Sequence, residues 1–465
     1  MAQPTQSLPA CSYLGNAVNL SSLDIDPGDV KSILRKSSLM PIVKIDQTIK
    51  TLVKPPGSAT VYGVPGNTVY DNLGSDNNSR DLLTERGNDL IEKMNADADI
   101  GVNYLSIGVT AGGHYSYSSA LKSTSVYGAF SFDQQVYGAH LDESKWYGFM
   151  NPTLLADIVK LPTWTMDTQG VYNTYQSFFQ RWGTHMITRS YLGNRYQLMV
   201  TRDTMSKESV SKFSLQVKAE FAGIIKGGGG NWGSETEKKE YLSTRHIDCH
   251  VLGGHPTESG NLARNPESKD AFEKWLAKRD AAYEAHLSFQ TQSLAIFLQN
   301  SSDPASQAAG KKLLPALQYC CNFVRLKGKL AYEVDKGSNM SVQWGECKLP
   351  ALPGLELSAT GTREWKVNSI TSSHVRVSRS GIGSSDPLVD ITVKAPPVKT
   401  IVSLNAALNT PTSSDKIMRF FLLSPYGTLP RQHETTVMTH KKSGEESKTL
   451  VEPSLRAFGA FKETL

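Results

Sequence analysis

One stretch of the chain satisfies two periodicities at once. Its apolar residues alternate with polar ones, as in a strand with one apolar face: Phe213, Leu215, Val217, Ala219 and Phe221 against Lys212, Gln216, Lys218 and Glu220. Apolar residues also recur every three or four positions, as on a helix face: Val210, Phe213, Val217, Phe221 and Ile224. Such a segment can pack as a helix in one state and pair as a strand in another. An ordinary amphipathic element in a soluble domain is the alternative.

A second stretch, Leu105 to Ser118, alternates as a strand only. Its odd positions form the apolar face: Leu105, Ile107, Val109, Ala111, Gly113, Tyr115 and Tyr117. After a turn-like Ser119 to Lys122, the even positions from Val126 to Phe132 continue the apolar series. About 14 residues exceed the roughly 9 to 11 that a tilted strand needs to cross a bilayer. The pattern fits a membrane hairpin, and it equally fits a half-buried antiparallel sheet.

Composition excludes several classes of protein. The 465 residues carry a net charge of +5 with charges of mixed sign, so nucleic acid is not expected as a partner. No apolar run reaches the roughly 18 residues of a transmembrane helix, and no export signal is visible, so we expect a soluble chain. The five cysteines lack metal-binding spacing and are interpreted as mostly buried thiols, with one or two disulfides left open.

The chain divides into two parts at Lys348, where prolines and a glycine follow. Residues 1–348 mix alternating segments with expected helices at Asn151–Lys160, Ser268–Asn300 and Pro304–Leu326. Residues 349–465 contain short β-rich stretches separated by turn residues and carry most of the net positive charge, which predicts a small all-β domain that binds a membrane or a receptor.

No catalytic or cofactor motif is convincing. Gly228 to Gly233 matches G-x-G-x-x-G, but no buried strand precedes it and the charged run Ser-Glu-Thr-Glu-Lys-Lys-Glu follows it. A phosphate-binding loop, a nucleophile elbow and a zinc-protease helix are not found in the sequence. We therefore expect neither an enzyme nor a bound cofactor or metal.

Between the two alternating stretches lies Tyr175-Gln-Ser-Phe-Phe-Gln-Arg-Trp-Gly-Thr-His-Met186. It resembles the signature of the membrane attack complex/perforin (MACPF) superfamily, which also includes the cholesterol-dependent cytolysins (CDC). The matching residues are Tyr175, Trp182, Gly183, Thr184 and His185. Val251 to Gly254 resembles the pair of glycines at the bend of the family's central sheet, here Gly253 and Gly254. Thr184 and His185 are expected to form hydrogen bonds at a helix-to-strand corner rather than to perform chemistry.

The resemblance implies an α+β fold, in which a bent antiparallel sheet is flanked by helical clusters that unfurl into two transmembrane hairpins per subunit of a homo-oligomeric ring. It also implies a protein that is secreted or released as a soluble monomer and forms a pore in the membrane of its target cell. We assign the hairpins to residues 107–142 and 203–243, with Gly227 to Gly230 as the tip of the second. The lipid-facing residues are then Val109, Ala111, Tyr115, Tyr117, Phe213, Leu215, Val217, Ala219 and Phe221, and the lumen-facing ones Lys212, Gln216, Lys218 and Glu220. Val217→Asp is expected to abolish lysis and leave the monomer folded.

The two-domain layout is similar to that of pleurotolysin-B-like toxins. That resemblance implies recruitment by an aegerolysin partner to membranes rich in sphingomyelin and cholesterol. Single-component bacterial insecticidal MACPF toxins, and non-lytic family members that act in adhesion or development, remain alternatives. A secreted β-rich hydrolase is a weaker one.

Overall fold

The computed structural model describes most of the first 321 residues and the strands of the C-terminal part. The described residues are 6–21, 30–86, 90, 107–109, 125–165, 168–203, 207–226, 232–278, 283–321, 324–334, 341–348, 353–361, 365–371, 374–379, 389–395, 402–409, 416–423, 436–440 and 449–451. Within these ranges no helix is both long enough and apolar enough to cross a membrane.

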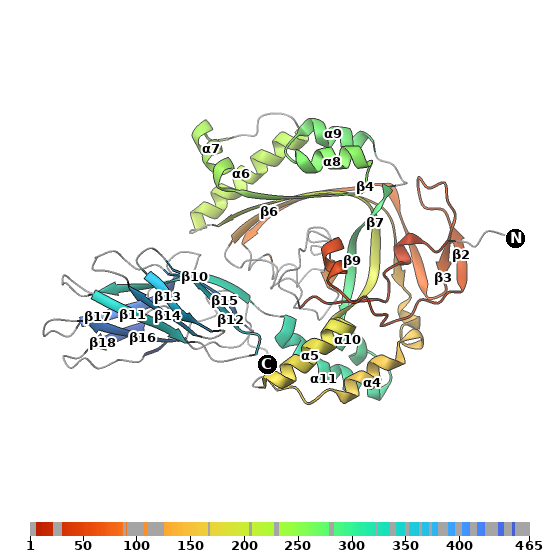
Figure 1. Cartoon of the computed structure of the whole chain (residues 1–465). Coiled ribbons are helices and arrows are strands. Elements are labelled where there is room, and N and C mark those ends of the chain that lie inside the picture. Colours follow the sequence, from red (N-terminus) through yellow and green to blue (C-terminus); the bar gives the residue numbers. More distant parts are fainter. Residues whose placement is uncertain are drawn as a thin grey trace.

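A seven-stranded sheet forms the centre of the molecule (Figure 1). Its main path runs β4 (Thr68–Arg86), β6 (Ser125–Leu141), β7 (His185–Asp203), β9 (Ala285–Ser293) and β5 (Ile107–Val109). Two further strands, β1 (Ala17–Val18) and β8 (His246–Leu252), pair with β7. Every pairing is antiparallel except that of β5 with β9. The expected α+β fold with a bent antiparallel sheet is confirmed.

The sheet bends midway along its long strands. The upper half of β7 pairs with β8 over Arg195–Thr201, whereas its lower half pairs with β9 over His185–Gly193. At the same level the β4–β6 register shifts between Asn72 and Asn77, and the β6–β7 register shifts between Gln135 and Tyr137. Extra residues in one strand of a pair bend the sheet and increase its twist.

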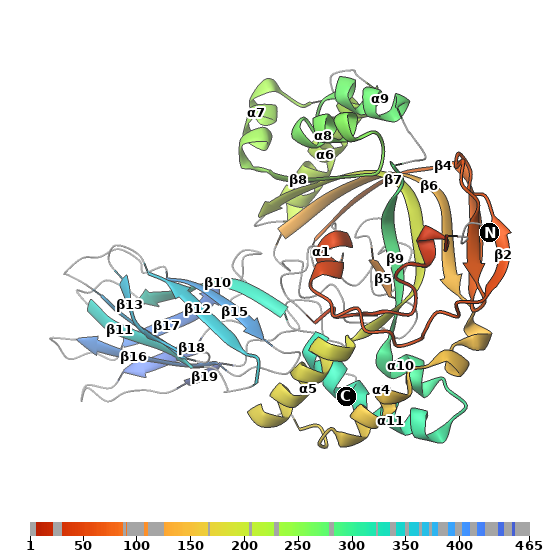
Figure 2. The ribbon, with the colours of Figure 1, turned by 45° about the vertical axis from the view of Figure 1, so that its right-hand side comes forward.

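Helices cover the two halves of the sheet separately (Figures 1 and 2). The upper half carries α6 (Lys207–Lys226), α7 (Glu235–Thr244), α8 (Pro256–Arg264) and α9 (Lys269–Ala277). Below the lower half lie α4 (Pro152–Lys160), α5 (Gln169–Trp182), α10 (Leu294–Gln299) and α11 (Pro304–Cys321). A two-stranded sheet of β2 (Ile49–Val53) and β3 (Tyr62–Pro65) lies beyond β4, and α1 (Val30–Arg35) lies beyond the opposite edge (Figure 2).

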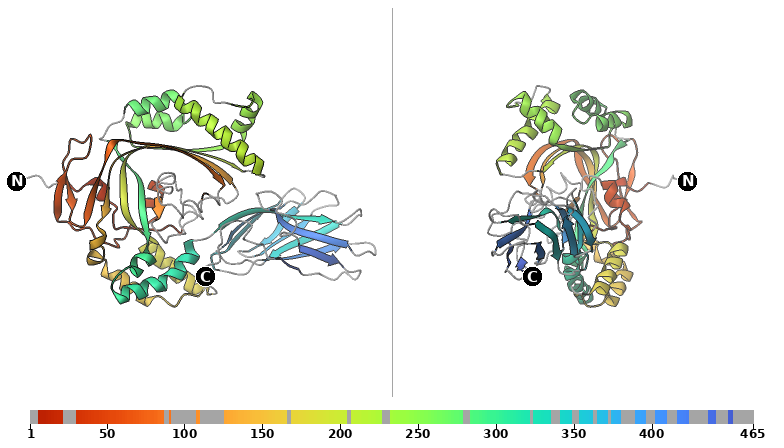
Figure 3. Two further views of the ribbon diagram at one scale, coloured as in Figure 1. Left: turned by 180° about the vertical axis from the view of Figure 1, so that it is seen from behind. Right: turned by 60° about the vertical axis from the view of Figure 1, so that its left-hand side comes forward.

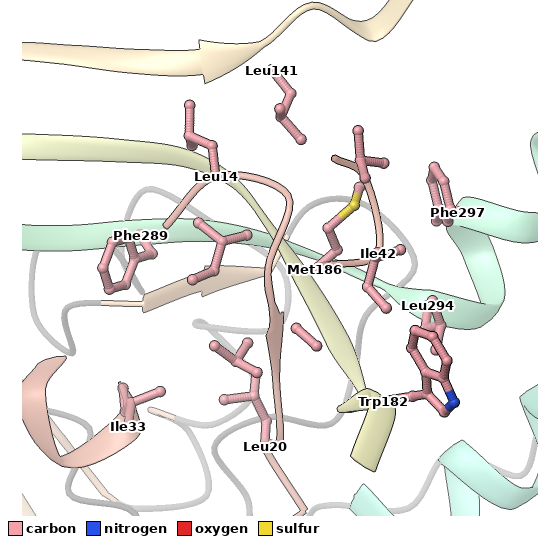
Figure 4. Close-up of a cluster of buried hydrophobic side chains, with 14 of the residues drawn as sticks. Leu14, Leu20, Ile33, Ile42, Leu141, Trp182, Met186, Phe289, Leu294 and Phe297 are labelled. Atoms are coloured by element: carbon pink, nitrogen blue, oxygen red, sulfur yellow. The ribbon is translucent and has the colours of Figure 1, made fainter. Parts of the chain in front are cut away.

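Two hydrophobic clusters stabilise this arrangement. The larger joins the N-terminal segment, the lower half of the sheet and the lower helices; Leu14, Leu20, Ile42, Trp182, Met186, Phe289, Leu294 and Phe297 are among its buried members (Figure 4). The second lies between the upper half of the sheet and helices α6 to α9. At roughly 25 cal/mol per Å² of buried apolar area, each cluster outweighs any single polar contact.

The C-terminal part consists of two five-stranded antiparallel sheets, which lie beside the core (Figure 3). One contains β12 (Glu356–Thr360), β15 (Val389–Ala395), β10 (Val324–Val334), β17 (Lys416–Leu423) and β18 (Thr436–His440). The other contains β13 (Trp365–Ile370), β14 (His374–Arg379), β11 (Ser341–Lys348), β16 (Val402–Asn409) and β19 (Thr449–Val451). Because β10 and β11 pair inside these sheets, the boundary predicted at 348/349 is wrong. It lies between Cys321 and Val324.

Local predictions had mixed outcomes. Helix α4 begins as expected, with the Asn151 side chain accepting a hydrogen bond from the Thr153 N–H and Pro152 in the first turn. The single helix predicted over Ser268–Asn300 is wrong, because strand β9 separates α9 from α10. Four cysteines are free thiols, of which Cys11, Cys320 and Cys321 are buried and Cys249 is half-buried.

Candidate functional site

Four strand ends of the central sheet meet at one edge. The terminal pairs are Arg86 with Val126, Ser125 with Asp203, and Thr201 with His246. Two segments leave from this edge and return to it: residues 87–124 join β4 to β6, and residues 204–245 join β7 to β8. Each segment therefore connects neighbouring antiparallel strands and can lengthen both of them. Residues 204–245 can do so without breaking a described strand pair, whereas residues 87–124 must first release the pairing of β5 with β9.

In the structure, most of the second segment folds into α6 and α7. Helix α6 buries the face predicted from helical spacing, since Phe213, Val217, Phe221 and Ile224 lie in one cluster with β6 and β7. Val217 contacts the sheet where Gly128 leaves room: a Cβ on residue 128 would stand 2.6 Å from a Val217 methyl. Phe221 packs on Phe130, with ring centroids 5.0 Å apart. Of the two periodicities in this segment, the helical one is realised here.

The polar residues of α6 divide into two groups. Lys212 and Lys218 are exposed, and Lys212 forms an ion pair with Glu237 of α7 at 3.0 Å. Gln216 and Glu220 are buried, although the strand pattern predicts them on a water-facing surface. Leu215 is 67% exposed despite its apolar side chain. The helix thus leaves one predicted lipid-facing residue in water and buries two predicted lumen-facing ones.

Glu220 is held by a polar cluster that ties three elements together. Arg245, which follows α7, donates to Glu220 at 2.8 Å and to Glu267, between α8 and α9, at 2.5 Å. The Tyr241 hydroxyl also donates to Glu220. Burial, and after it the Glu220 carboxylate, raise the pKa of Tyr241, so its hydroxyl stays protonated. Breaking a buried pair leaves an uncompensated charge, so this cluster favours the helical form of the segment.

The signature residues form the corner between α5 and β7. The Tyr175 hydroxyl donates to the Pro162 carbonyl at 2.9 Å, and the Trp182 indole donates to Asp157 at 3.0 Å. Gly183 ends α5 with φ +67°, and a Cβ there would stand 2.7 Å from the Val18 carbonyl oxygen. The Thr184 hydroxyl accepts from the Leu20 N–H at 2.8 Å, and its oxygen lies 2.9 Å from His185 Nδ1. These contacts agree with the structural role that the sequence predicted for Thr184 and His185.

His185 makes the stability of this corner depend on pH. Full burial lowers its pKa to about 3, so the native ring stays neutral while the unfolded chain takes up a proton below pH ~6.5. Because the unfolded state then binds more protons, stability falls as the pH drops, by about 2 kcal/mol from this group at pH 5. Urea unfolding at pH 7.5 and 5.0 should show a smaller loss for His185→Gln than for the unsubstituted chain. Equal losses would contradict a neutral buried ring.

Glycines at the bend permit close approach of three backbones. Gly253 has φ +69°, and a Cβ there would stand 2.4 Å from the Gly193 carbonyl oxygen. Gly254 has φ +76° and lies against the indole of Trp275. After this pair the chain leaves the sheet for α8 and α9 before returning as β9. The predicted placement of Gly253 and Gly254 at the sheet bend agrees with this geometry.

Gly253→Ala is expected to lower the free energy of unfolding by about 2 kcal/mol or more, since a Cβ meets rigid backbone at a left-handed φ. Gly260→Ala is the matched control, because a Cβ in helix α8 at that position meets nothing within 4 Å. That control should stabilise by about 0.4–1 kcal/mol. Urea unfolding of both variants measures the difference, and equal effects would show that the bend tolerates a side chain.

A buried ion pair beside the bend was missed by the sequence analysis. Asp133 of β6 and Arg195 of β7 are directly paired, completely buried, and joined by two hydrogen bonds. Arg195 also donates to the Leu287 carbonyl of β9 at 3.1 Å, and Ser131 donates to Asp133 at 2.8 Å. The pair thus links three strands where β7 changes partners. Asp133, the one acidic residue of β6, was the signal that could have revealed it.

A known protein family has a sequence model that matches the part of the chain containing most of this sheet edge and its helices. The family model described as MAC/Perforin domain matches residues 108–280, which span β6 to α9. The chain carries a MAC/Perforin domain. The predicted resemblance to the MACPF family is therefore confirmed over these residues, and the signature corner and the Gly253–Gly254 bend both fall inside the match.

Similar solved structures share little sequence with this chain. GNIP1Aa from Chromobacterium piscinae is 12% identical, with 95% of this chain and 93% of that chain covered and a TM-score of 0.46. A putative cell invasion protein with a MAC/Perforin domain from Bacteroides thetaiotaomicron is 11% identical, with coverages of 68% and 62% and a TM-score of 0.32. The cytotoxin suilysin from Streptococcus suis is 11% identical, with coverages of 74% and 62% and a TM-score of 0.22.

The first predicted hairpin region, residues 107–142, needs correction. Residues 107–142 do not form one segment beside the sheet, because Ser125–Leu141 is strand β6 of the sheet itself. Val109 lies in β5, which pairs with β9 at the far edge, while Ala111, Tyr115 and Tyr117 lie outside the described residues. The segment that matches residues 204–245 in topology is therefore 87–124.

The effect predicted for the Val217→Asp variant also needs correction. Its side chain is fully buried between α6 and the sheet. An aspartate there would place a carboxylate in an apolar cluster, so Val217→Asp would destabilise the monomer. It cannot separate membrane insertion from folding as the sequence analysis expected.

Proposed function

We propose that the chain is a pore-forming protein that binds a membrane, assembles into a ring and inserts two β-hairpins per subunit. The observation that carries this proposal is the common sheet edge from which residues 87–124 and 204–245 depart. Extension of both segments lengthens four neighbouring strands in the order β4, β6, β7, β8. Joined around a ring, such sheets close into a barrel, the one strand architecture that satisfies every backbone group in lipid.

The pattern of residues 87–124 supports two amphipathic strands. Even positions are mainly apolar before the midpoint: Met94, Ala96, Ala98, Ile100, Val102 and Tyr104. Odd positions are apolar after it: Leu105, Ile107, Val109, Ala111, Tyr115 and Tyr117. The first series spans 11 residues and the second 13, so each is long enough for the roughly 9 to 11 residues of a membrane-crossing strand. The register of β4 and β6, with Arg86 opposite Val126, pairs odd positions with odd ones when it is continued, so a one-residue shift is needed to bring the two apolar series onto one face. With that shift we propose the sequence before it as the partner of the strand at 105–118, and the face proposed to contact lipid keeps Val109, Ala111, Tyr115 and Tyr117.

The C-terminal β-sandwich is proposed to select the membrane. It follows the MAC/Perforin core as a separate β-domain and lies beside it (Figure 1). We propose membrane lipids as the partner, recruited through an aegerolysin if the pleurotolysin-like layout reflects shared function. A directly bound receptor, as proposed for the single-component alternative, would make the aegerolysin dispensable.

Dye release from liposomes and lysis of red cells test the proposal, with negative-stain imaging of the same membranes. Each measurement is made with and without an aegerolysin on membranes containing sphingomyelin and cholesterol. Release together with rings supports pore formation, and dependence on the aegerolysin selects the two-component form. Membrane binding without release or rings would overturn the proposal in favour of a non-lytic role in adhesion or development.

A further inference from the structure

The register of β7 and β8 fixes how residues 204–245 can pair when they extend. Thr201 stands opposite His246, and the preceding pairs follow in the same antiparallel register down to Arg195 opposite Leu252. In an antiparallel ladder the two position numbers of each pair have a constant sum. Continuing this register without a shift places Lys212 opposite Glu235, Phe213 opposite Ser234, and Leu215 opposite Trp232.

We infer that the second hairpin turns at Gly223–Ile224, and that the glycine run after α6 lies in its membrane-spanning return strand rather than at its tip. This inference rests on the proposed function. In the continued register Ala222 stands opposite Ile225, which leaves a two-residue loop of Gly223 and Ile224. Glycine at the first loop position is the requirement of a type II′ turn, one of the two favoured tight hairpin turns.

Side-chain faces agree with this register. The apolar positions 213, 215, 217, 219 and 221 then stand opposite Ser234, Trp232, Gly230, Gly228 and Lys226, and cross-strand partners share a face. Trp232 therefore joins the lipid-contacting surface beside Leu215. Lys226, next to the turn, reaches the far side of the bilayer, where a lysine can extend its charge into water.

The positions of the charged residues also agree with the continued register. About ten residues from Phe213 to Ala222 cross the membrane, and their partners, from Ile225 to Ser234, include a single charge, Lys226. The charged run Glu235 to Glu240 stays outside the bilayer. A tip at Gly227–Gly230 would instead place that run within the bilayer, where each lipid-facing charge opposes insertion.

Two double-cysteine variants distinguish these registers. Ser214→Cys/Gly233→Cys joins partners in the continued register, whereas Ser214→Cys/Ser243→Cys joins partners for a tip at Gly227–Gly230. Gly233 and Ser243 are exposed and Ser214 is half-buried in the monomer, so neither variant disturbs a core contact. Membrane-bound rings are treated with a short cross-linker that carries a thiol-reactive maleimide at each end. The cross-linked peptides are identified by mass spectrometry, which also separates them from those of the native cysteines.

We expect a 214–233 cross-link in rings at least about ten times more abundant than the 214–243 cross-link. The reverse ratio, or equal amounts, would overturn the register while leaving pore formation intact. If the unsubstituted chain forms no rings on any membrane, the proposed function fails and this inference fails with it. Rings are therefore counted on the unsubstituted chain before cross-linking is compared.

Discussion

Leu215→Asp is expected to reduce lysis at least about 100-fold without lowering the stability of the monomer. Leu215 is 67% exposed on α6, so the substitution removes little packing and places the carboxylate in water. In the extended hairpin the same position faces acyl chains, where a charge raises the free energy of insertion, and the cost recurs in every subunit of a ring. Red-cell lysis measures the loss, and thermal unfolding of the monomer checks that the melting temperature is unchanged.

Lys218→Asp is the matched control for this variant. Lys218 is also exposed on α6 and receives the same side chain, so any loss of helix propensity is shared. Its predicted position is on the lumen-facing side of the strand, so lysis should remain within about threefold of the unsubstituted chain. If both variants lost lysis equally, or neither did, the alternating faces assigned to this segment would be wrong.

Much of the fold and part of the candidate site could be predicted from sequence because local patterns carry them. The Tyr175–His185 signature and the Gly253–Gly254 pair place chemically distinctive residues at a corner and a bend that tolerate few others. The sequence of α6 fits two periodicities, that of a strand and that of a helix, and the structure shows the helix. Packing decided between them, since the helical face fits Phe130 and Gly128 of the sheet.

Non-local pairing set the limits of those predictions. The alternation from Val126 to Phe132 is equally suited to a membrane hairpin and to β6, and only its partners β4 and β7 decide between them. Strands β10 and β11 precede the proline-rich segment at 349–354 yet pair with strands that follow it, so composition misplaced the boundary. The Asp133–Arg195 pair likewise joins strands about 60 residues apart in sequence.

A disulfide between α6 and the sheet is expected to abolish lysis reversibly. In Gly128→Cys/Val217→Cys, a Cβ at position 128 stands 3.3 Å from the Val217 Cβ, just below the range of about 3.5–4.5 Å found in disulfides. Loss of the two valine methyl groups gives the space for this small adjustment. The bond would hold the helix on β6, so residues 204–245 could not extend, although the surface that first meets a membrane would be unchanged.

Lysis should be absent from the oxidised protein and recover to at least about half of the unsubstituted level after reduction. Membrane binding of the oxidised form, followed by co-sedimentation with liposomes, should persist, because the lock acts after binding. The single variants under the same oxidation control for pairing with the native thiols, of which the half-buried Cys249 belongs to the same cluster. Full lysis by a protein shown by mass spectrometry to contain the 128–217 bond would mean that α6 never leaves the sheet. Since release of α6 is the step that turns one amphipathic sequence from helix into strand, that result would remove the second hairpin from the mechanism.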